Sequence, residues 1–191
     1  LTSSLRNTIT NNTCDQNGQH GIYLDNSNDN DISNSTCLDN TGDGIRLSSS
    51  DRNDLINNTC ASPNMFYVSN NAGIYLTSSY NNDIVNNTCN NNGDGLHIYS
   101  GEYNTVSGNN LSHNNNYMGT KANIKIGSSN NNILNNTCLG ASVGLSINSG
   151  DDLRIEGNTF SSNTVGITPS NAWFTYARLL IANKINSTSQ N

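Results

Sequence analysis

A four-residue motif returns along the chain at intervals that define a structural unit. The tetrapeptide NNTC occurs at residues 11–14, 57–60, 86–89 and 135–138, and a close copy, NSTC, occurs at 34–37. A second motif, typically Gly followed by alternating apolar residues as in GIYL, returns with it every 21 to 29 residues. Its copies begin at Gly21, Gly44, Gly73, Gly95, Asn123, Gly144 and Gly166. Self-similarity at 20 to 50 residues indicates a solenoid, in which each repeat packs on its neighbours.

The composition restricts the classes of partner. Only 12% of the residues are charged and 32% are hydrophobic, which alone is typical of disorder, but the apolar residues return in phase with the motifs. The net charge of −6 and the absence of a basic run argue against nucleic acid as a partner. No apolar stretch is long enough to be a membrane span.

Each repeat reads as three short strands and three bends. The Gly motif alternates apolar and variable residues, as in Ile22 and Leu24, which predicts a strand with one buried face. A second pattern, Asn-x-apolar-x-x-Asn-x-Cys, marks the next two strands, as in Asn82 to Cys89. No copy has the spacing of apolar residues that a helix needs. The sequence therefore predicts an all-β, right-handed, single-stranded parallel β-helix of about seven to eight coils.

In such a coil, residues of equal phase stack about 4.8 Å apart and form columns through the interior. Cysteine is then a small apolar core residue, interchangeable with Leu, Phe and Ile. The predicted column contains Cys14, Cys37, Cys60, Cys89, Leu111, Cys138, Phe160 and Ile185. Buried free thiols are favoured over a metal site, and disulfides between stacked neighbours are the alternative. Because Leu111 intervenes, Cys89 and Cys138 should lie beyond disulfide reach, about 10 Å apart.

Asparagine is expected to form two further columns, because its side chain can donate and accept along a stack and because it tolerates the left-handed backbone of a bend. The first column stands two residues before the cysteine position, with Ser35 as an exception: Asn12, Asn58, Asn87, Asn109, Asn136, Asn158 and Asn183. The second stands at the preceding turn: Asn7, Asn30, Asn53, Asn82, Asn104 and Asn131.

The segment GIYLTSSYNNDIVNNTC (73–89) and its copies resemble the parallel β-helix repeat proteins of the NosD-like and carbohydrate-binding or sugar-hydrolase group. In character the chain looks most like archaeal cell-surface repeat proteins. The group includes pectate-lyase-like enzymes, epimerases, glycosidases and surface proteins, so the resemblance implies the fold and a secreted or cell-surface location. It does not select one activity.

The repeats define one domain over residues 1–170, followed by a divergent segment at 171–191. LTSSLRN at Leu1 matches LTSSYNN at Leu76, so we expect the first coil to be truncated and the chain to be part of a longer polypeptide. The divergent segment is interpreted as a distorted last coil or C-terminal cap that covers the open core. A surface that docks a following domain or another copy is the alternative.

The outward position of the first strand gathers unusual side chains. It carries Tyr23, Arg46, Tyr75, His97 and Lys125, while His20, Asp43 and Asp94 precede the glycines nearby. Insertions at 62–71 and 112–121 lead into this strand and are expected to wall a groove. The resemblance implies that a glycan lies along this face, and ordinary solvated side chains are the alternative. The candidate carbohydrate-binding residues are Tyr23, Arg46, Tyr75, Asp94, His97 and Lys125.

No catalytic residue, metal or cofactor is assigned. Asp43 and Asp94 should lie two coils apart, roughly 10 Å, which is at or beyond the separation used by inverting glycosidases. For a lyase or epimerase, the candidates are Tyr75 or His97 as the base, with Arg46 or Lys125 facing a carboxylate. The preferred interpretation is a structural or adhesive domain of a surface layer, sheath or wall. Its expected partners are polysaccharide or other copies of itself, and the alternative is a polysaccharide-active enzyme with a groove near His97.

Overall fold

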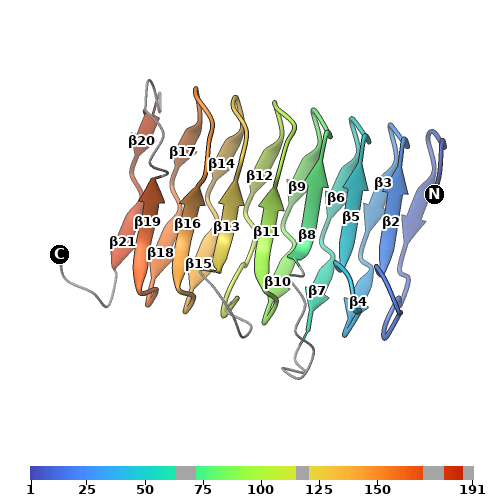
Figure 1. Cartoon of the computed structure of the whole chain (residues 1–191), viewed down its shortest axis with the longest axis horizontal. Helices are drawn as coiled ribbons and strands as arrows, with labels where there is room; N and C mark the ends of the chain where they lie inside the picture. Colours follow the sequence, from blue (N-terminus) through green and yellow to red (C-terminus); the bar gives the residue numbers. More distant parts are fainter. Residues whose placement is uncertain (63–71, 115–120, 170–178, 187–191) are drawn as a thin grey trace.

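The protein is a β-solenoid in which each coil stacks on the previous one along the long axis (Figure 1). The computed structural model describes residues 1–62, 72–114, 121–169 and 179–186. Within these ranges there are strands and turns, and no helix that is long and apolar enough to span a membrane.

Three sheets run along the solenoid, and each coil adds one strand to each sheet except where noted below. Sheet 1 contains β2 (Ile22–Asp25), β5 (Ile45–Ser48), β8 (Ala72–Thr77), β11 (Asp94–Ile98), β13 (Ala122–Ile126), β16 (Val143–Ile147) and β19 (Val165–Pro169). Sheet 2 contains β1 (Thr8–Thr10), β3 (Asp31–Ser33), β6 (Asp54–Ile56), β9 (Asp83–Val85), β12 (Thr105–Ser107), β14 (Asn132–Leu134), β17 (Arg154–Glu156) and β20 (Leu179–Ile181). Sheet 3 has two parts, one with β4 (Thr36–Leu38), β7 (Thr59–Ala61) and β10 (Thr88–Asn90), the other with β15 (Thr137–Leu139), β18 (Thr159–Ser161) and β21 (Lys184–Asn186).

The pairing between coils confirms the predicted repeat unit. Every pair is parallel and joins equivalent residues of consecutive coils, such as Ile45 with Ile74 and Ile74 with Leu96 in sheet 1. The seven strands of sheet 1 correspond to about seven turns, which we number coils 1 to 7 from β2 to β19. The predicted all-β parallel β-helix is therefore correct.

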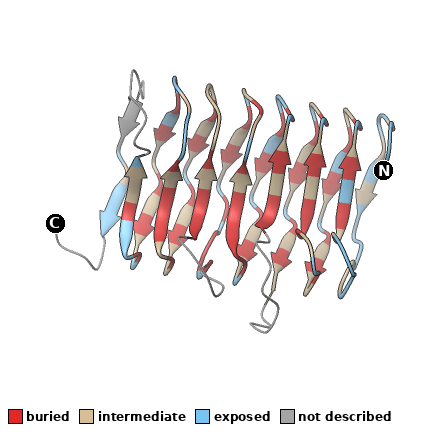
Figure 2. Ribbon diagram, in the orientation of Figure 1, coloured by how far each residue is buried: buried red, intermediate tan, exposed pale blue. Residues whose placement is uncertain are grey.

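Buried residues recur along the strands of successive coils (Figure 2). They are mostly stacked aliphatic residues and cysteines, which fill the interior. Cys37, Cys60 and Cys89 pair in register and are buried, whereas Cys14 at the first rung is half-buried. All five cysteines are free thiols. A hydrogen bond with Cys60, together with burial, raises the pKa of the Cys37 thiol, and burial raises that of Cys138. The cysteines thus pack as small apolar residues, as predicted.

Sheet 3 is interrupted at the rung predicted to carry a leucine. There Asn110 makes single backbone pairs with Thr88 on one side and Thr137 on the other. Leu111 follows it, is fully buried, and stands between Cys89 and Cys138 in the column. The predicted position of Leu111 is confirmed.

Both predicted asparagine ladders are present. At the corner between sheets 2 and 3, the Oδ1 of Asn87 accepts the backbone N–H of Asn58 at 2.8 Å and its side-chain amide at 3.1 Å. The same two bonds join Asn87 to Asn109, and Asn136 to Asn158. Each buried amide accepts hydrogen bonds from the coil before it and donates a hydrogen bond to the coil after it. The polar groups buried at the corners therefore have hydrogen-bond partners.

One part of the asparagine interpretation is wrong. The left-handed backbone lies not on the ladder residue but on the exposed residue before it, as in Asn57 with φ 57° and Asn86 with φ 56°. The corner between sheets 1 and 2 follows the same rule, with Asp29 at φ 57° and Arg52 at φ 53°. The reason is that the ladder side chain must point inward, and the bend that aims it inward is made one residue earlier.

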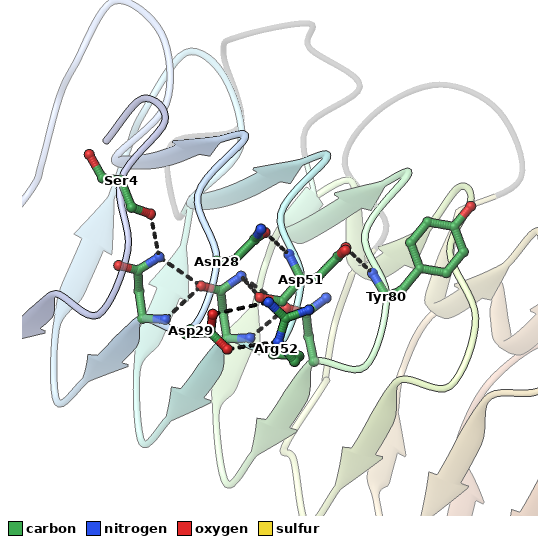
Figure 3. Close-up of polar contacts among 9 residues, drawn as sticks. Ser4, Asn28, Asp29, Asp51, Arg52 and Tyr80 are labelled. Carbon is green, nitrogen blue, oxygen red and sulfur yellow. Dashed lines mark hydrogen bonds and ion pairs between the residues drawn. The ribbon is translucent and has the colours of Figure 1, made fainter.

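Two of these left-handed residues, Asp29 and Arg52, carry partly exposed side chains that interact with one another (Figure 3). Arg52 donates from Nε and Nη2 to the two carboxylate oxygens of Asp29, at 2.7 and 3.0 Å, across one coil. Beside them, Asn28 accepts the backbone N–H of Asp51, and Asp51 accepts that of Tyr80. This corner is therefore bonded on its outer edge as well as through its ladder.

A third ladder, not predicted, runs along the corner that leads into sheet 1. Asn92 and Asn114 occupy it in consecutive coils, and a Cβ at Gly95 would lie 2.6 Å from the Asn114 amide nitrogen. In coil 5 the glycine is replaced by Asn123, whose side chain accepts from Asn114 at 2.9 Å and donates to Asn163 at 3.1 Å. In the next coil the ladder position is occupied by Ala141, which has no side-chain amide. Asn123, in strand β13, supplies the missing amide between Asn114 and Asn163.

The last coil continues the register of the repeats. Leu180 pairs with Ile155, Asn183 accepts from the Asn158 backbone at 2.9 Å, and Ile185 pairs with Phe160. Most of the segment interpreted as a cap, including Trp173, lies outside the described residues.

Candidate functional site

The variable residues of sheet 1 form one continuous outward column. Strand register places Tyr23 beside Arg46, Arg46 beside Tyr75, Tyr75 beside His97, and His97 beside Lys125. Parallel strands lie about 4.8 Å apart, so these five side chains follow one another along the solenoid axis. The structure therefore brings together the residues that the sequence analysis singled out.

Two buried aspartates lie beside this column. Asp43 and Asp94 are 4% and 3% exposed, and alanines occupy the same position in the coils that follow them. In both, Oδ1 accepts the backbone N–H of that next alanine, Ala72 or Ala122, at 2.9 Å. Ala72 separates the two carboxylates, which would repel one another in adjacent coils, and the backbone bonds fix the direction of each Oδ2.

The Asp94 carboxylate lies close to a histidine and a lysine. Its Oδ2 lies 3.8 Å from Nδ1 of His97 and 4.0 Å from Nζ of Lys125. Burial lowers the pKa of His97 to about 4. The negative charge of Asp94 raises this pKa, whereas the positive charges of Lys125 and Lys121 lower it further. The imidazole is therefore neutral at pH 7, in contact with one carboxylate and close to two cations.

The Asp43 carboxylate makes an equivalent set of contacts. Its Oδ2 accepts from Nη1 of Arg46 at 3.0 Å and lies 3.4 Å from Nδ1 of His20. That nitrogen also accepts the Asp43 backbone N–H at 2.8 Å, which requires a neutral ring protonated at Nε2. Burial lowers the pKa of His20, in agreement with this tautomer.

Aromatic rings connect the two aspartate sets. The Arg46 guanidinium carbon lies 4.5 Å from the centre of the Tyr75 ring, and the His97 ring meets the Tyr75 ring edge-on at 5.0 Å. Tyr99 stacks on Tyr75 at 6.4 Å and is 60% exposed. Burial raises the pKa of Tyr75, so its phenol stays protonated at neutral pH.

The sequence analysis missed Tyr99 and Lys121. Tyr99 is two residues after His97, so strand alternation places it on the same face, and this signal was available in the sequence. Lys121 ends the insertion at 112–121, where the repeat gives no phase. The predicted groove walls stay a prediction, because residues 63–71 and 115–120 lie outside the described part of the chain.

The aspartates are not arranged as a glycosidase pair. Asp43 and Asp94 are separated by the coil of Ala72, or about 10 Å for two strand spacings, and both carboxylates already accept a backbone N–H group. The separations used for glycoside hydrolysis are mostly shorter.

These features define a class of protein: a parallel β-solenoid with asparagine ladders and one outward row of cations and aromatic rings. The sequence profile of the family described as "Periplasmic copper-binding protein (NosD)" matches residues 1–65 and 64–190. The chain belongs to the NosD family. No curated protein sequence matches it.

Solved structures with the same fold include mannuronan and alginate epimerases. The A-module of the mannuronan C-5 epimerase AlgE4 of Azotobacter vinelandii is similar with a TM-score of 0.83 and 20% identity, over 96% of this chain and 54% of that one. The AlgE6 A-module of the same organism gives 0.79 and 16%, over 96% and 53%. A point mutant of the periplasmic alginate epimerase AlgG gives 0.73 and 18%, over 96% and 45%. The chain thus spans about half the length of these proteins, and the similarity shows the fold.

The copper in the family description does not fit the residues in hand. Each imidazole of the site faces a single carboxylate, and the Nδ1 of His20 is already bonded to a backbone N–H group. The stacked cysteines have raised pKa values at Cys37 and Cys138, which disfavours the thiolate form that binds metal. Within the described ranges, no three His, Cys, Asp or Glu residues are grouped so that they could hold a metal ion.

Proposed function

We propose that this chain is a glycan-binding β-solenoid domain that works outside the cytoplasm and binds anionic polysaccharide at the His97 cluster. We define this cluster as Tyr75, Asp94, His97, Tyr99 and Lys125. Such a domain would serve an adhesive or structural role in a wall, sheath or surface layer. The periplasmic description of the family and the periplasmic name of AlgG support the location.

The local charge carries the proposal. The whole chain has a formal charge of −6 with only eight Lys and Arg residues, yet the outward side chain of Lys125 is 25% exposed while that of Asp94 beside it is 4% exposed. Because His97 is neutral, the ammonium of Lys125 is the charge that the cluster presents to solvent. An anion that approaches this face therefore meets a cation although the chain as a whole is acidic.

The aromatic side chains favour a sugar over a small anion. Tyr99 presents 60% of its surface to solvent, and its ring is held by stacking on Tyr75. A ring fixed in this way can contact the apolar face of a pyranose while Lys125 faces a carboxylate of the same polymer. The names of the structural neighbours, mannuronan and alginate epimerases, point to polymers of this kind.

The test is a titration of polymannuronate, with neutral mannan in parallel, against three folded proteins. These are the wild type, the triple variant Tyr75→Ala, His97→Ala, Lys125→Ala, and a control double variant, Tyr103→Ala, Arg154→Ala, which removes an exposed ring and a cation away from the cluster. We expect binding of the anionic polymer by the wild type and the control, weaker at high salt, and a loss of binding by the triple variant. Equal binding by all three proteins, or by none, would refute the proposal.

A second function is favoured by the protonation of the same cluster. Epimerisation or elimination at the carbon beside a uronate carboxylate needs a base, and epimerisation also needs an acid on the other face of the sugar. The geometry fits elimination better: neutral His97 can accept the proton from the carbon, protonated Tyr75, whose ring contacts His97 at 5.0 Å on the same side, can protonate the leaving glycosidic oxygen, and Lys125 can face the carboxylate. The check is proton NMR of oligomannuronate incubated with the protein in deuterium oxide. Deuterium in the sugar or an unsaturated product, absent with His97→Gln, would establish catalysis, whereas unchanged sugar would leave binding alone.

A further inference from the structure

We infer that the Asp43 cluster, defined as His20, Tyr23, Asp43 and Arg46, is a second subsite for the same polymer. The ligand would then be an extended anionic polysaccharide that lies along the solenoid axis, across the strands of sheet 1. This inference rests on the proposed function and specifies the length and direction of its ligand.

The two clusters are built in the same way. In both, an Asp-Gly-aliphatic sequence places a buried aspartate three residues before an outward side chain, Arg46 in coil 2 and His97 in coil 4. In both, the next coil donates a backbone N–H to Oδ1 at 2.9 Å, and Oδ2 faces a cation, Arg46 at 3.0 Å or Lys125 at 4.0 Å. The same construction, repeated after two coils on one face, is expected for a ligand that itself repeats.

The Asp43 cluster can still bind an anion although its arginine is paired. A guanidinium has five N–H donors, and the contact with Asp43 uses Nη1. The side chain of Arg46 is 30% exposed, more than that of Lys125 at 25%. The aspartate therefore orients Arg46, and the remaining edge of the fork is available to a carboxylate.

Tyr75 joins the two clusters into one surface. The centre of its ring lies 4.5 Å from the guanidinium carbon of Arg46 and 5.0 Å from the centre of the His97 ring. Tyr23 extends the row by one coil, and its ring centre lies 5.4 Å from that of His20. The distance from Arg46 to Lys125 is three strand spacings, or about 14 Å. A disaccharide is too short to span this distance, whereas a longer oligosaccharide can span it.

The experiment measures affinity against chain length, with oligomannuronates from the disaccharide to the octasaccharide. For the wild type we expect affinity to rise steeply once the chain reaches both clusters. For Arg46→Ala we expect a loss of about tenfold with the octasaccharide, the scale of one charge-assisted hydrogen bond, and no change with the disaccharide bound at the His97 cluster. Arg154→Ala, on sheet 2, is the matched control.

A second variant guards against misfolding, because Arg46→Ala leaves the buried Asp43 carboxylate without its cation. The pair Asp43→Asn, Arg46→Gln removes both charges, should stay folded by circular dichroism, and should show the same loss for long chains only. If the wild type binds no oligomannuronate of any length, the proposed function fails. If it binds them but both Arg46 variants keep wild-type affinity at every length, the second subsite alone is refuted.

Discussion

The asparagine ladder can be tested at its centre by Asn87→Ala. The side chain of Asn87 accepts the backbone N–H and the amide of Asn58, and donates to the carbonyls of Leu55 and Val85 and to the Asn109 side chain. Alanine removes all these contacts in a place where Leu55, Asn58 and Asn109 are 0 to 1% exposed. Water therefore cannot replace them without opening the corner.

The magnitude follows from the groups that are left without partners. The buried backbone N–H of Asn58 loses its acceptor, which costs about 1–3 kcal/mol, and the Leu55 carbonyl loses a donor, so we expect a total of about 2–4 kcal/mol. For a chain of this length, a destabilisation of that size lowers the Tm by roughly 4–16 °C. Asn87→Ser should cost less, because Ser35 occupies the same position in coil 1 and its hydroxyl accepts the Asn12 backbone N–H at 3.2 Å.

The assay is urea and thermal unfolding followed by circular dichroism. The control is Asn132→Ala, an outward and half-buried asparagine of β14, which should change stability by less than about 0.5 kcal/mol. We expect the order wild type, Asn87→Ser, Asn87→Ala. If Asn87→Ala unfolds together with Asn132→Ala, the ladder does not stabilise the fold and the reasoning is wrong.

Three further predictions concern the coil, the thiols and pH. Gly73→Ala should destabilise the protein by about 1–3 kcal/mol in chemical denaturation, since the new Cβ would lie 2.6 Å from the Cβ of Cys89; wild-type stability would argue against that contact. In the native protein Cys14, the half-buried thiol, should react with a thiol reagent before the other four, and mass spectrometry should find no disulfide between Cys89 and Cys138. Because the folded pKa of His97 is lowered from 6.5 to about 4, its contribution to stability is complete above pH 6.5 and is lost as the pH falls toward 4. The unfolding free energy of the wild type should therefore fall more over that range than that of His97→Gln, and equal slopes would contradict the shift.

The fold could be predicted from the sequence because a coil fixes each residue against its equivalent in the next coil. Once the period was read, the register followed, and even the irregular rung at Leu111 was placed correctly. The location of the left-handed residues could not be read in this way. Two asparagines stand together at several corners, such as Asn57 with Asn58 and Asn86 with Asn87, and the pattern does not say which one bends the chain and which one points inward.

The candidate site was predicted in part for a related reason. The column from Tyr23 to Lys125 follows from phase alone, and its register is confirmed. The position of a residue in the repeat does not predict its side-chain geometry. It does not show that Asp94 faces both His97 and Lys125, or that the Arg46 guanidinium lies over the Tyr75 ring. Those contacts depend on rotamers and burial, which a repeat pattern does not specify.

The most direct measurement is an NMR titration of the 20.5 kDa protein with oligomannuronate, following the backbone amides and the histidine side chains. Binding at the outward face of sheet 1 predicts that the largest shift changes occur in β5, β8, β11 and β13, and that the His97 imidazole and the amide of Tyr99 are among the affected signals. Changes confined to sheet 2, or spectra that do not change at saturating oligosaccharide, would contradict a glycan-binding role for this face.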